Sequence, residues 1–348
     1  MQNDEIQTRP CPACPVCGST GRQLYRGLPD RLFDVPGTWS ISKCDNPVCG
    51  TLWLDPMPVE ADLPKLYASY FTHQDAPLKT ERNLLQRLLD RVRAAYLHAR
   101  YGYEPHPRPS LIDRLLGWIA YAYPAWKDGL DSSVFHLRAK PGGRLLEIGC
   151  GSGATLQSMQ QKGWNVIGLD FDEGAVDNAR SKGLDVHHGR LSAQGFADGG
   201  FDAVVMSHVI EHVPSPSELL AECHRILKPG GVLVALTPNA DSSLHRCHGR
   251  HWLSLDPPRH LQIFTSASLS VIAARAGYAR VETITSMHGF IYVDLASAEL
   301  AANEKYVIGG PVALPRRILG HIKALGFGWK RALTRGNDGE EIVLVCRK

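Results

Sequence analysis

The residues best placed to do chemistry begin with a glycine-rich turn, "LLEIGCGSG" at Leu145–Gly153. Its first five residues form an apolar run interrupted by Glu147. Three glycines follow at alternate positions, Gly149, Gly151 and Gly153. Glycine lets the backbone turn tightly and approach a ligand closely. Asp170 ends the next apolar run, where a carboxylate can accept hydrogen bonds from ribose hydroxyls.

The spacing of this turn indicates which kind of ligand it binds. A dinucleotide site usually has the pattern G-x-G-x-x-G, with a helix N-terminus facing pyrophosphate. The sequence here reads G-C-G-S-G-A, and an acid just before the first glycine suits a pyrophosphate poorly. The charge of Glu147 instead suits a positive amino or sulfonium group. The turn therefore favours a ligand of the S-adenosylmethionine type over NAD.

A second pattern, "SHVIEHVPSP", contains His208, Glu211 and His212 with the H-x-x-E-H spacing of inverzincin zinc proteases. On one helix, His208 and His212 would share a face and could hold zinc. However, the apolar run "FDAVVM" leads directly into Ser207, and two prolines follow within four residues of His212. We therefore expect a crossover from strand to helix, which excludes the long helix of a protease.

Cysteines form a third group, because five of the nine fall within the first 49 residues. Cys14 and Cys17, followed by Cys44 and Cys49, have the spacing of a four-thiolate zinc ribbon. A glycine follows each pair, and Cys11 could substitute for Cys14. The alternatives are a degenerate ribbon or free thiols. A zinc site closed by four thiolates would stabilise the fold rather than catalyse.

The elements that position these residues can be read from hydrophobic periodicity. Residues 80–100 and 111–137 have helical spacing, with a break near Pro124. From Arg144, seven strand-length apolar runs alternate with helical stretches at 154–162, 173–182 and 217–227. This pattern predicts an α/β fold, a Rossmann-like, doubly wound and mostly parallel seven-stranded sheet. The expected division is a zinc ribbon at 10–58, a helical cap at 59–140 and the main domain at 141–348, with a helical insertion at 288–338.

The insertion is basic, because no acid lies between Glu304 and Asp338. Large apolar residues recur within it at helical spacing: Ile318, Ile322, Leu325, Trp329 and Leu333. One interpretation is an amphipathic lid helix with a solvated basic face. The other is a surface for an anionic acceptor, such as a nucleotide-sugar or lipid-linked glycan, or for a peripheral membrane contact through 315–335.

The motifs "LLEIGCGSG", "GLDFDEGAVDNAR", "FDAVVMSHVIEHVPSPSELLAECHRILKPGG" and "LVALTPNADS" resemble those of class I S-adenosylmethionine-dependent methyltransferases. The nearest branch includes the ubiquinone-biosynthesis O-methyltransferases, and the resemblance covers residues 144–277. It implies that the Gly149–Gly153 turn wraps the cofactor and that Asp170 holds its ribose. Phe171 would lie against the adenine, with Arg190 near the adenine edge. Ser207 would lie beside the transferable methyl group.

The resemblance also bears on catalysis. A base is needed where a hydroxyl or phenol acceptor must lose a proton, and His208, His212 and His260 are the candidates. In the ubiquinone-pathway enzymes, a Glu occupies the position of His208, and acidic residues there have been linked to a divalent ion. The loop at 251–269 also resembles these relatives. Its Trp252 and Arg259 either face the acceptor with His260 or belong to a loop pinned by two prolines.

Composition limits the possible functions. A net charge of +3 over 348 residues disfavours nucleic acid as the partner. The N-terminus lacks the apolar core of a secretory signal, and we expect a cytoplasmic protein. The N-terminal segment resembles that of methyltransferases encoded with surface-polysaccharide genes, of sugar C-methyltransferases and of ribosomal RNA methyltransferases. The sequence gives no indication of oligomeric state.

The predicted function is methyl transfer from S-adenosylmethionine to a small-molecule or glycan acceptor, with oxygen as the favoured atom. The alternatives are an RNA methyltransferase that uses the ribbon to hold nucleic acid, and a scaffold that binds the cofactor without turnover.

Overall fold

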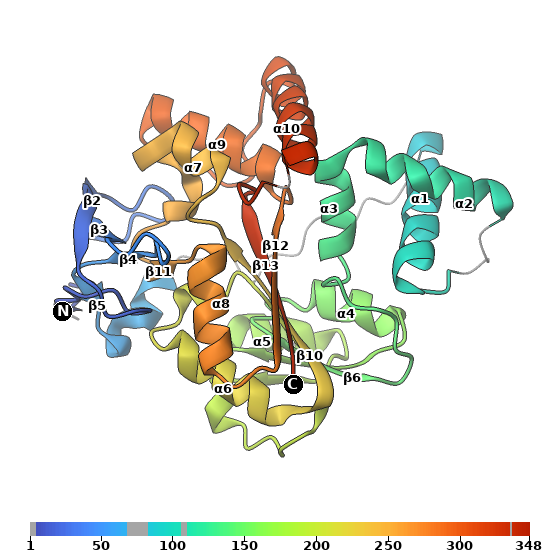
Figure 1. The fold of residues 1–348 in the computed structure, drawn as a ribbon, viewed down its shortest axis with the longest axis horizontal. Helices are drawn as coiled ribbons and strands as arrows, with labels where there is room; N and C mark the ends of the chain where they lie inside the picture. Colours follow the sequence, from blue (N-terminus) through green and yellow to red (C-terminus); the bar gives the residue numbers. More distant parts are fainter. Residues whose placement is uncertain (1–4, 68–82, 106–109, 335) are drawn as a thin grey trace.

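The computed structural model describes residues 5–67, 83–105, 110–334 and 336–348 (Figure 1). The start of the helix expected from residue 80 lies outside these ranges, and so does the basic residue at 335. Within the described ranges, no helix is both long enough and apolar enough to cross a bilayer.

The centre of the molecule is a seven-stranded sheet with the order β12-β13-β10-β9-β6-β7-β8 (Figure 1). Its strands are β6 (Arg144–Ile148), β7 (Asn165–Asp170), β8 (Val186–His188), β9 (Phe201–Ser207), β10 (Leu227–Pro238), β12 (Arg280–Ser286) and β13 (Glu341–Arg347). Neighbours from β10 to β8 are parallel, whereas β13 is antiparallel to both β10 and β12. The expected mostly parallel sheet is therefore confirmed. Strands such as β9 are apolar throughout their centre because helices cover both faces.

The antiparallel direction of β13 has a consequence for the edge where ligands of such sheets bind. Parallel strands end at one common edge, and β9 ends there with Ser207. Because β13 runs the opposite way, its first residue, Glu341, lies at that same edge. There Glu341 is in register with Pro238 of β10 and Ser286 of β12. The edge thus includes a residue from close to the end of the chain.

Helices connect the strands and cover the sheet. They are α4 (Ala154–Gln161), α5 (Glu173–Ser181), α6 (Pro216–Ile226), α7 (Ser243–His248), α8 (Ser266–Arg275), α9 (Phe290–Asn303) and α10 (Leu314–Thr334). Their ends follow local sequence signals: Asp172 caps α5, and Thr265 opens α8 with a reciprocal capping box. Two of the helices, α9 and α10, occupy the stretch between β12 and β13.

A helical arm precedes the sheet and projects to the right of Figure 1. It consists of α1 (Leu84–Tyr101), α2 (Leu111–Gly117), the 3-10 helix η2 (Trp118–Ala122) and α3 (Pro124–Ser132). Pro124 stands at the first position of α3, which explains the break at this residue because proline suits a helix start. The hydroxyls of Tyr96 and Tyr101 both donate to Asp131, at 2.7 and 2.8 Å, and so fasten α1 to α3.

The N-terminal segment forms a small antiparallel sheet of β2 (Gly21–Leu28), β3 (Trp39–Cys44), β4 (Leu52–Leu54) and β11 (Gln262–Ile263). Its fourth strand, β11, comes from the loop after β10 and pairs with β4. Buried Trp53 and Cys49 belong to the same apolar cluster as Phe264 and Leu269. The N-terminal segment and the main sheet therefore share one hydrophobic core.

Candidate cofactor and acceptor site

The glycine turn after β6 has the backbone geometry that only glycine adopts easily. Gly149, Gly151 and Gly153 all have positive φ angles, of 71°, 51° and 81°. A Cβ at Gly149 would lie 2.4 Å from Val209, and one at Gly153 would lie 2.4 Å from Leu184. A Cβ at Gly151 would meet nothing within 4 Å. Packing thus requires the outer two glycines, whereas the middle one leaves its backbone open to a ligand.

Two buried carboxyl groups lie beside this turn. Glu147 is 4% exposed, and its Oε2 has no hydrogen-bond partner among the described residues. Burial, together with the charge of Asp170, raises the pKa of Glu147 to about 8. Asp170 accepts hydrogen bonds from the amides of Gly151 (2.8 Å) and Asp172 (3.0 Å), and burial raises its pKa as well. A ligand that brings a positive group and hydroxyls would complement this pair.

A short segment from the N-terminal part of the chain lies against the same edge. The 3-10 helix η1 (Glu60–Tyr67) ends at Tyr67, whose ring packs edge-to-face on Phe171 at 5.0 Å. The Tyr67 hydroxyl is 2.9 Å from Nδ1 of His212. Arg190, near the expected adenine edge, forms an ion pair with Glu60. Sequence reasoning missed Tyr67, and its only signal was the aromatic stretch at 66–73, of which residues 68–73 lie outside the described ranges.

His208 follows β9 in a conformation that is strained for any residue except glycine, with a φ of 52°. Its Nδ1 lies 3.2 Å from Oε1 of Glu211, and its Nε2 lies 3.0 Å from Oε1 of Glu341. Burial opposes the charged ring, but the hydrogen bonds to these carboxylates raise the pKa of His208 well above its ordinary value. The contacts with the two carboxylates therefore favour the charged form of the His208 ring.

Glu341 also holds a second histidine. Its Oε2 accepts from Nδ1 of His288 at 3.0 Å, and this bond raises the pKa of His288. Burial opposes ionisation of Glu341, but the hydrogen bonds from His208 and His288 lower its pKa to about 2. Both histidine side chains are 43% exposed, so they form part of the accessible edge. Sequence reasoning missed Glu341 and His288 because no local motif connects residues so far apart.

His212 and His260 differ from His208 in their hydrogen bonds. Nδ1 of His212 is 3.0 Å from the carbonyl of Arg259, and Nδ1 of His260 is 2.8 Å from the carbonyl of Ser254. Because a carbonyl only accepts, these contacts form in the tautomer with the proton on Nδ1, which leaves Nε2 free to accept; the Tyr67 hydroxyl shares Nδ1 of His212. Burial and the proximity of His260 lower the pKa of His212 to about 4.

The same two histidines lie beside Glu211. The ring centroids of His212 and His260 are 4.7 Å apart, and ligand atoms of both histidines and Glu211 lie within 4.8 Å of one another. Oε2 of Glu211 accepts from the hydroxyl of Thr237 at 2.9 Å. Burial alone would raise the pKa of Glu211, but the hydrogen bond from His208 and the neighbouring histidines lower it to about 2. The group has the donor types that a divalent metal ion uses.

The loop at 251–269 is part of the protein interior. Trp252 is buried, and its indole N–H donates to Oε1 of Glu340 at 2.8 Å. Arg259 is fully buried and pairs with Asp30 at 2.6 Å and with Asp256. The interpretation in which Trp252 and Arg259 face the acceptor is therefore wrong. Their types are explained by the contact between this loop and the N-terminal segment.

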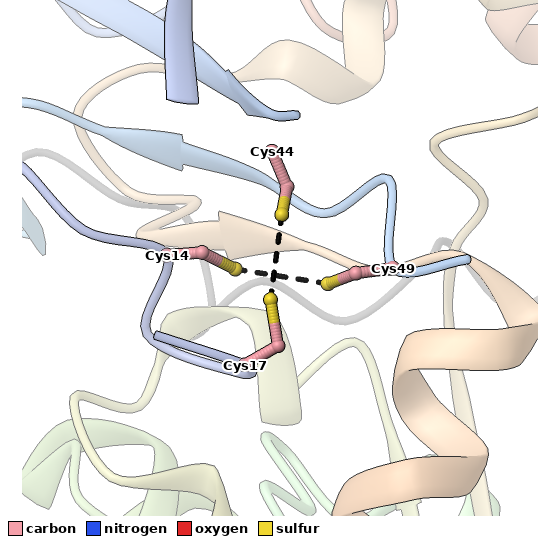
Figure 2. A group of neighbouring side chains, drawn as sticks. All are labelled: Cys14, Cys17, Cys44 and Cys49. Atoms are coloured by element: carbon pink, nitrogen blue, oxygen red, sulfur yellow. Dashed lines mark hydrogen bonds between the residues drawn. The ribbon is translucent and has the colours of Figure 1, made fainter. Parts of the chain in front are cut away.

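Four of the five N-terminal cysteines converge, as Figure 2 shows. The Sγ atoms of Cys14 and Cys49 are 3.7 Å apart, and those of Cys17 and Cys44 are 3.4 Å apart. All four lie within 4.8 Å of one another, whereas Cys11 is not a member of the group. Tetrahedral zinc with bonds of about 2.3 Å would separate its sulfurs by about 3.8 Å, close to these distances.

Turns of the type seen in zinc knuckles hold these cysteines. Gly18 and Gly50 follow the two pairs with positive φ angles of 75° and 60°. The Gly18 amide donates to the carbonyl of Cys14 at 2.9 Å. The site is also tied to the main domain, because the hydroxyl of Thr265, which caps α8, donates to the carbonyl of Cys49 at 2.7 Å.

Comparisons with known proteins agree with this geometry. A family model described as a methyltransferase domain matches residues 119–283. A ubiquinone biosynthesis O-methyltransferase of Thiobacillus denitrificans is 33% identical over 159 residues, which cover 42% of this chain and 68% of that protein. A probable S-adenosylmethionine-dependent methyltransferase of Mycolicibacterium smegmatis is 32% identical over 154 residues, covering 42% of this chain and 55% of that protein.

The chain belongs to the S-adenosylmethionine-dependent methyltransferase family. This confirms the family that the sequence motifs indicated. The chain spans about half the length of several of these relatives, such as the ubiquinone biosynthesis O-methyltransferase of Pseudomonas aeruginosa, of which it covers 45% at 37% identity. A solved S-adenosylmethionine-dependent methyltransferase of Thermotoga maritima, described as a possible histamine N-methyltransferase, is 20% identical. It has a TM-score of 0.44, with 68% of this chain and 96% of that chain covered.

Proposed function

We propose that this protein transfers the methyl group of S-adenosylmethionine to an acceptor bound at the edge formed by β9, β12 and β13. The observation that carries the proposal is Glu147, a buried carboxyl group whose Oε2 has no hydrogen-bond partner among the described residues. Such a group costs stability unless a ligand compensates it. The cofactor supplies an activated methyl group on a positive sulfonium, and its amino group suits this carboxyl.

The described residues support specific binding roles. The backbone of Gly149, Gly151 and Gly153 would wrap the methionine and ribose parts, since Gly151 leaves its backbone open. Asp170 would hold the ribose hydroxyls with the lone pairs that its two backbone bonds leave unused. Phe171, which is 51% exposed, would cover the adenine beside Tyr67. Ser207 would border the methionine part at the end of β9.

The side chains around the acceptor would act mainly by positioning and by excluding water, because the methyl group is already activated. Where the acceptor is a hydroxyl, we propose that His212 or His260 accepts its proton at Nε2, since each Nδ1 is engaged by a carbonyl. His208 would instead be a cation that positions the acceptor, because both of its nitrogens already donate to carboxylates.

We infer that the acceptor is a small molecule or glycan and that oxygen receives the methyl group. The relatives named as O-methyltransferases support the choice of oxygen. The formal net charge of +3 gives an RNA acceptor no support.

We also propose that Cys14, Cys17, Cys44 and Cys49 hold a structural zinc ion. The sulfur distances and the two knuckle turns support this assignment. Four thiolates would close the coordination sphere, so the metal would stabilise residues 10–58 rather than take part in methyl transfer. In this proposal, residues 59–140 cap the main domain at 141–348, and the insertion at 288–338 covers the acceptor edge.

Calorimetry with S-adenosylhomocysteine tests cofactor binding. We expect Asp170→Ala to weaken binding by at least about tenfold, because a buried carboxylate bonded to ribose hydroxyls is lost. Asp177→Ala is the control, since this acid lies on neighbouring α5 with 72% of its side chain exposed. The proposal fails if the unaltered protein does not bind, or if both variants bind as well as it does. Transfer of labelled methyl groups to a panel of acceptors then distinguishes an enzyme from a scaffold.

A further inference from the structure

Helix α10 contacts the rest of the protein through its smallest residues. Gly320, Ala324 and Gly328 are its buried positions, spaced four residues apart on one face. A Cβ at Gly320 would lie 3.2 Å from Ile291 of α9, and one at Gly328 would lie 2.9 Å from Pro124 of α3. The helix therefore packs closely against α9 and α3, and Phe327 adds a large apolar side chain to the contact, with its ring centroid 5.5 Å from that of Phe290 in α9.

Seven other large apolar residues of α10 point away from this contact. They are between 42% and 80% exposed: Leu314, Ile318, Leu319, Ile322, Leu325, Trp329 and Leu333. At 100° per residue, they cover about 140° of the helix surface, centred opposite the glycine positions. No charged residue falls within this sector. An ordinary surface helix buries such a face, so this one is the reverse of the usual arrangement.

Basic residues follow one edge of the exposed apolar sector. The helix contains five Lys or Arg residues and no Asp or Glu. At 100° per residue, Arg316, Lys323 and Lys330 lie beyond that edge, whereas Arg317 and Arg331 fall at the angle of the glycine positions. Arg316, Lys323 and Arg331 pair with Glu299, Asp294 and Asp128. Lys330 lies 4.0 Å from Asp338, and 64% of its side chain is accessible.

The apolar surface continues onto the helical arm. The indole N–H of Trp329 donates to the carbonyl of Ala122 in η2, at 3.3 Å. In that short helix, Trp118 is 69% exposed and Ile119 is 51% exposed. Figure 1 shows α10 at the top of the molecule with α3 directly beside it. Two separate parts of the chain therefore expose large apolar side chains next to each other.

We propose that α10 binds the surface of an anionic lipid bilayer, lying in the plane of the interface with its apolar sector among the lipids. An apolar face with Lys and Arg along one edge fits this environment, since acyl chains accommodate the apolar side chains and anionic headgroups attract the basic ones. A second copy fits less well, because two α10 helices would bring together only basic charged residues. The proposal goes beyond methyl transfer and does not depend on it.

Co-sedimentation of the full chain with vesicles tests this proposal. We expect binding to vesicles made of equal parts phosphatidylglycerol and phosphatidylcholine, weaker binding at high salt, and little binding to phosphatidylcholine alone. Ile322→Asp should weaken binding by at least about tenfold, because a charge replaces an exposed apolar side chain that the lipids would bury. Leu333→Asp, at a position that is 80% exposed, should act in the same way without disturbing the fold.

Two matched variants serve as controls. Val271→Asp introduces the same charge at an exposed apolar position on α8, and should leave vesicle binding unchanged. Lys330→Glu should weaken binding to the anionic vesicles, whereas Arg26→Glu on β2 should have a much smaller effect. The proposal is overturned if the chain binds neither vesicle, or if Val271→Asp is as harmful as Ile322→Asp. It is also overturned if Ile322→Asp dissociates a dimer and leaves vesicle binding intact. Cofactor affinity, measured in parallel, separates these outcomes from a failure of the methyltransferase proposal.

Discussion

Replacing Glu147 with Gln should stabilise the protein and, at the same time, weaken its binding of the cofactor. The side chain is 4% exposed, and its Oε2 finds no partner among the described residues. Burial and the neighbouring Asp170 raise its pKa from an ordinary 4.5 to about 8. Gln has nearly the same shape and no charge. The substitution therefore removes the cost of ionising this site and little else.

The size of the stabilisation follows from the difference in pKa between the folded and unfolded chains. A carboxyl group with a raised folded pKa contributes full stability below pH 4.5, and that contribution is lost as the pH rises from 4.5 through about 8. At pH 7, about 2.5 pH units above the unfolded pKa, the loss amounts to about 3 kcal/mol. The Gln amide needs hydrogen-bond partners of its own, so we expect a net gain of about 1–3 kcal/mol.

Cofactor binding should change in the opposite direction. Near pH 7 most of the Glu147 carboxyl is protonated, so a ligand that carries an ammonium group must first displace that proton. Below pH 8, affinity for S-adenosylhomocysteine should therefore fall by about tenfold for each pH unit, and Gln should abolish this dependence. Chemical denaturation without ligand measures the first effect, and calorimetry between about pH 6 and 8 measures the second.

Two results would refute this reasoning. One is a Gln variant whose free energy of unfolding equals that of the unaltered protein at pH 7 as well as at pH 4.5. The other is an affinity that changes with pH in the same way in both proteins, which would assign the titration to another group. The nearest such group is Asp170, whose pKa is also raised, so Asp170→Asn in the Glu147→Gln background would identify it.

Three further predictions concern other parts of the structure. Glu341→Gln should lower the pKa values of His208 and His288 toward 6.5, which ring-proton NMR titration would show, and should reduce turnover while leaving cofactor affinity unchanged. Cys49→Ser should abolish binding of one zinc ion per chain, as metal analysis would show, and should lower the Tm; an unchanged zinc content would contradict the four-thiolate assignment. Arg259→Met should cost about 3–5 kcal/mol in unfolding free energy because Asp30 is left buried without its partner, and adding Asp30→Asn should recover part of that loss.

Local sequence signals were sufficient for the main sheet and for the cofactor half of the site. The apolar runs from Arg144 onward predicted seven strands, and the glycine turn located Glu147 and Asp170 beside each other. These features are encoded within short segments. In a parallel sheet, consecutive strands also place such segments at one edge. Residues that are close in the sequence could therefore be predicted to lie close together in the structure.

The acceptor half could not be predicted in this way. Glu341 reaches His208 only because β13 inserts antiparallel between β10 and β12. This direction places the first residue of β13 beside the last residues of the neighbouring strands. Tyr67 contacts His212, which lies 145 residues further along the chain. The two interpretations of Arg259 could not be separated for the same reason, since its partner Asp30 belongs to the N-terminal segment. Side chains that meet through long-range topology leave no periodic or spaced pattern in the sequence.

The edge of the sheet combines one region of uncompensated carboxyl groups with one in which the carboxylates are paired with histidines. Beside β6 and β7, Glu147 and Asp170 have raised pKa values and form no ion pair with a basic residue of the described chain. Beside β9 and β13, Glu341 has a lowered pKa because His208 and His288 donate to it. In this second region His208 and His288 are paired with the carboxylates of Glu211 and Glu341, so the charges cancel. A ligand with an ammonium or sulfonium group would therefore be favoured beside β6 and β7, where no basic residue of the described chain competes for the two carboxyl groups.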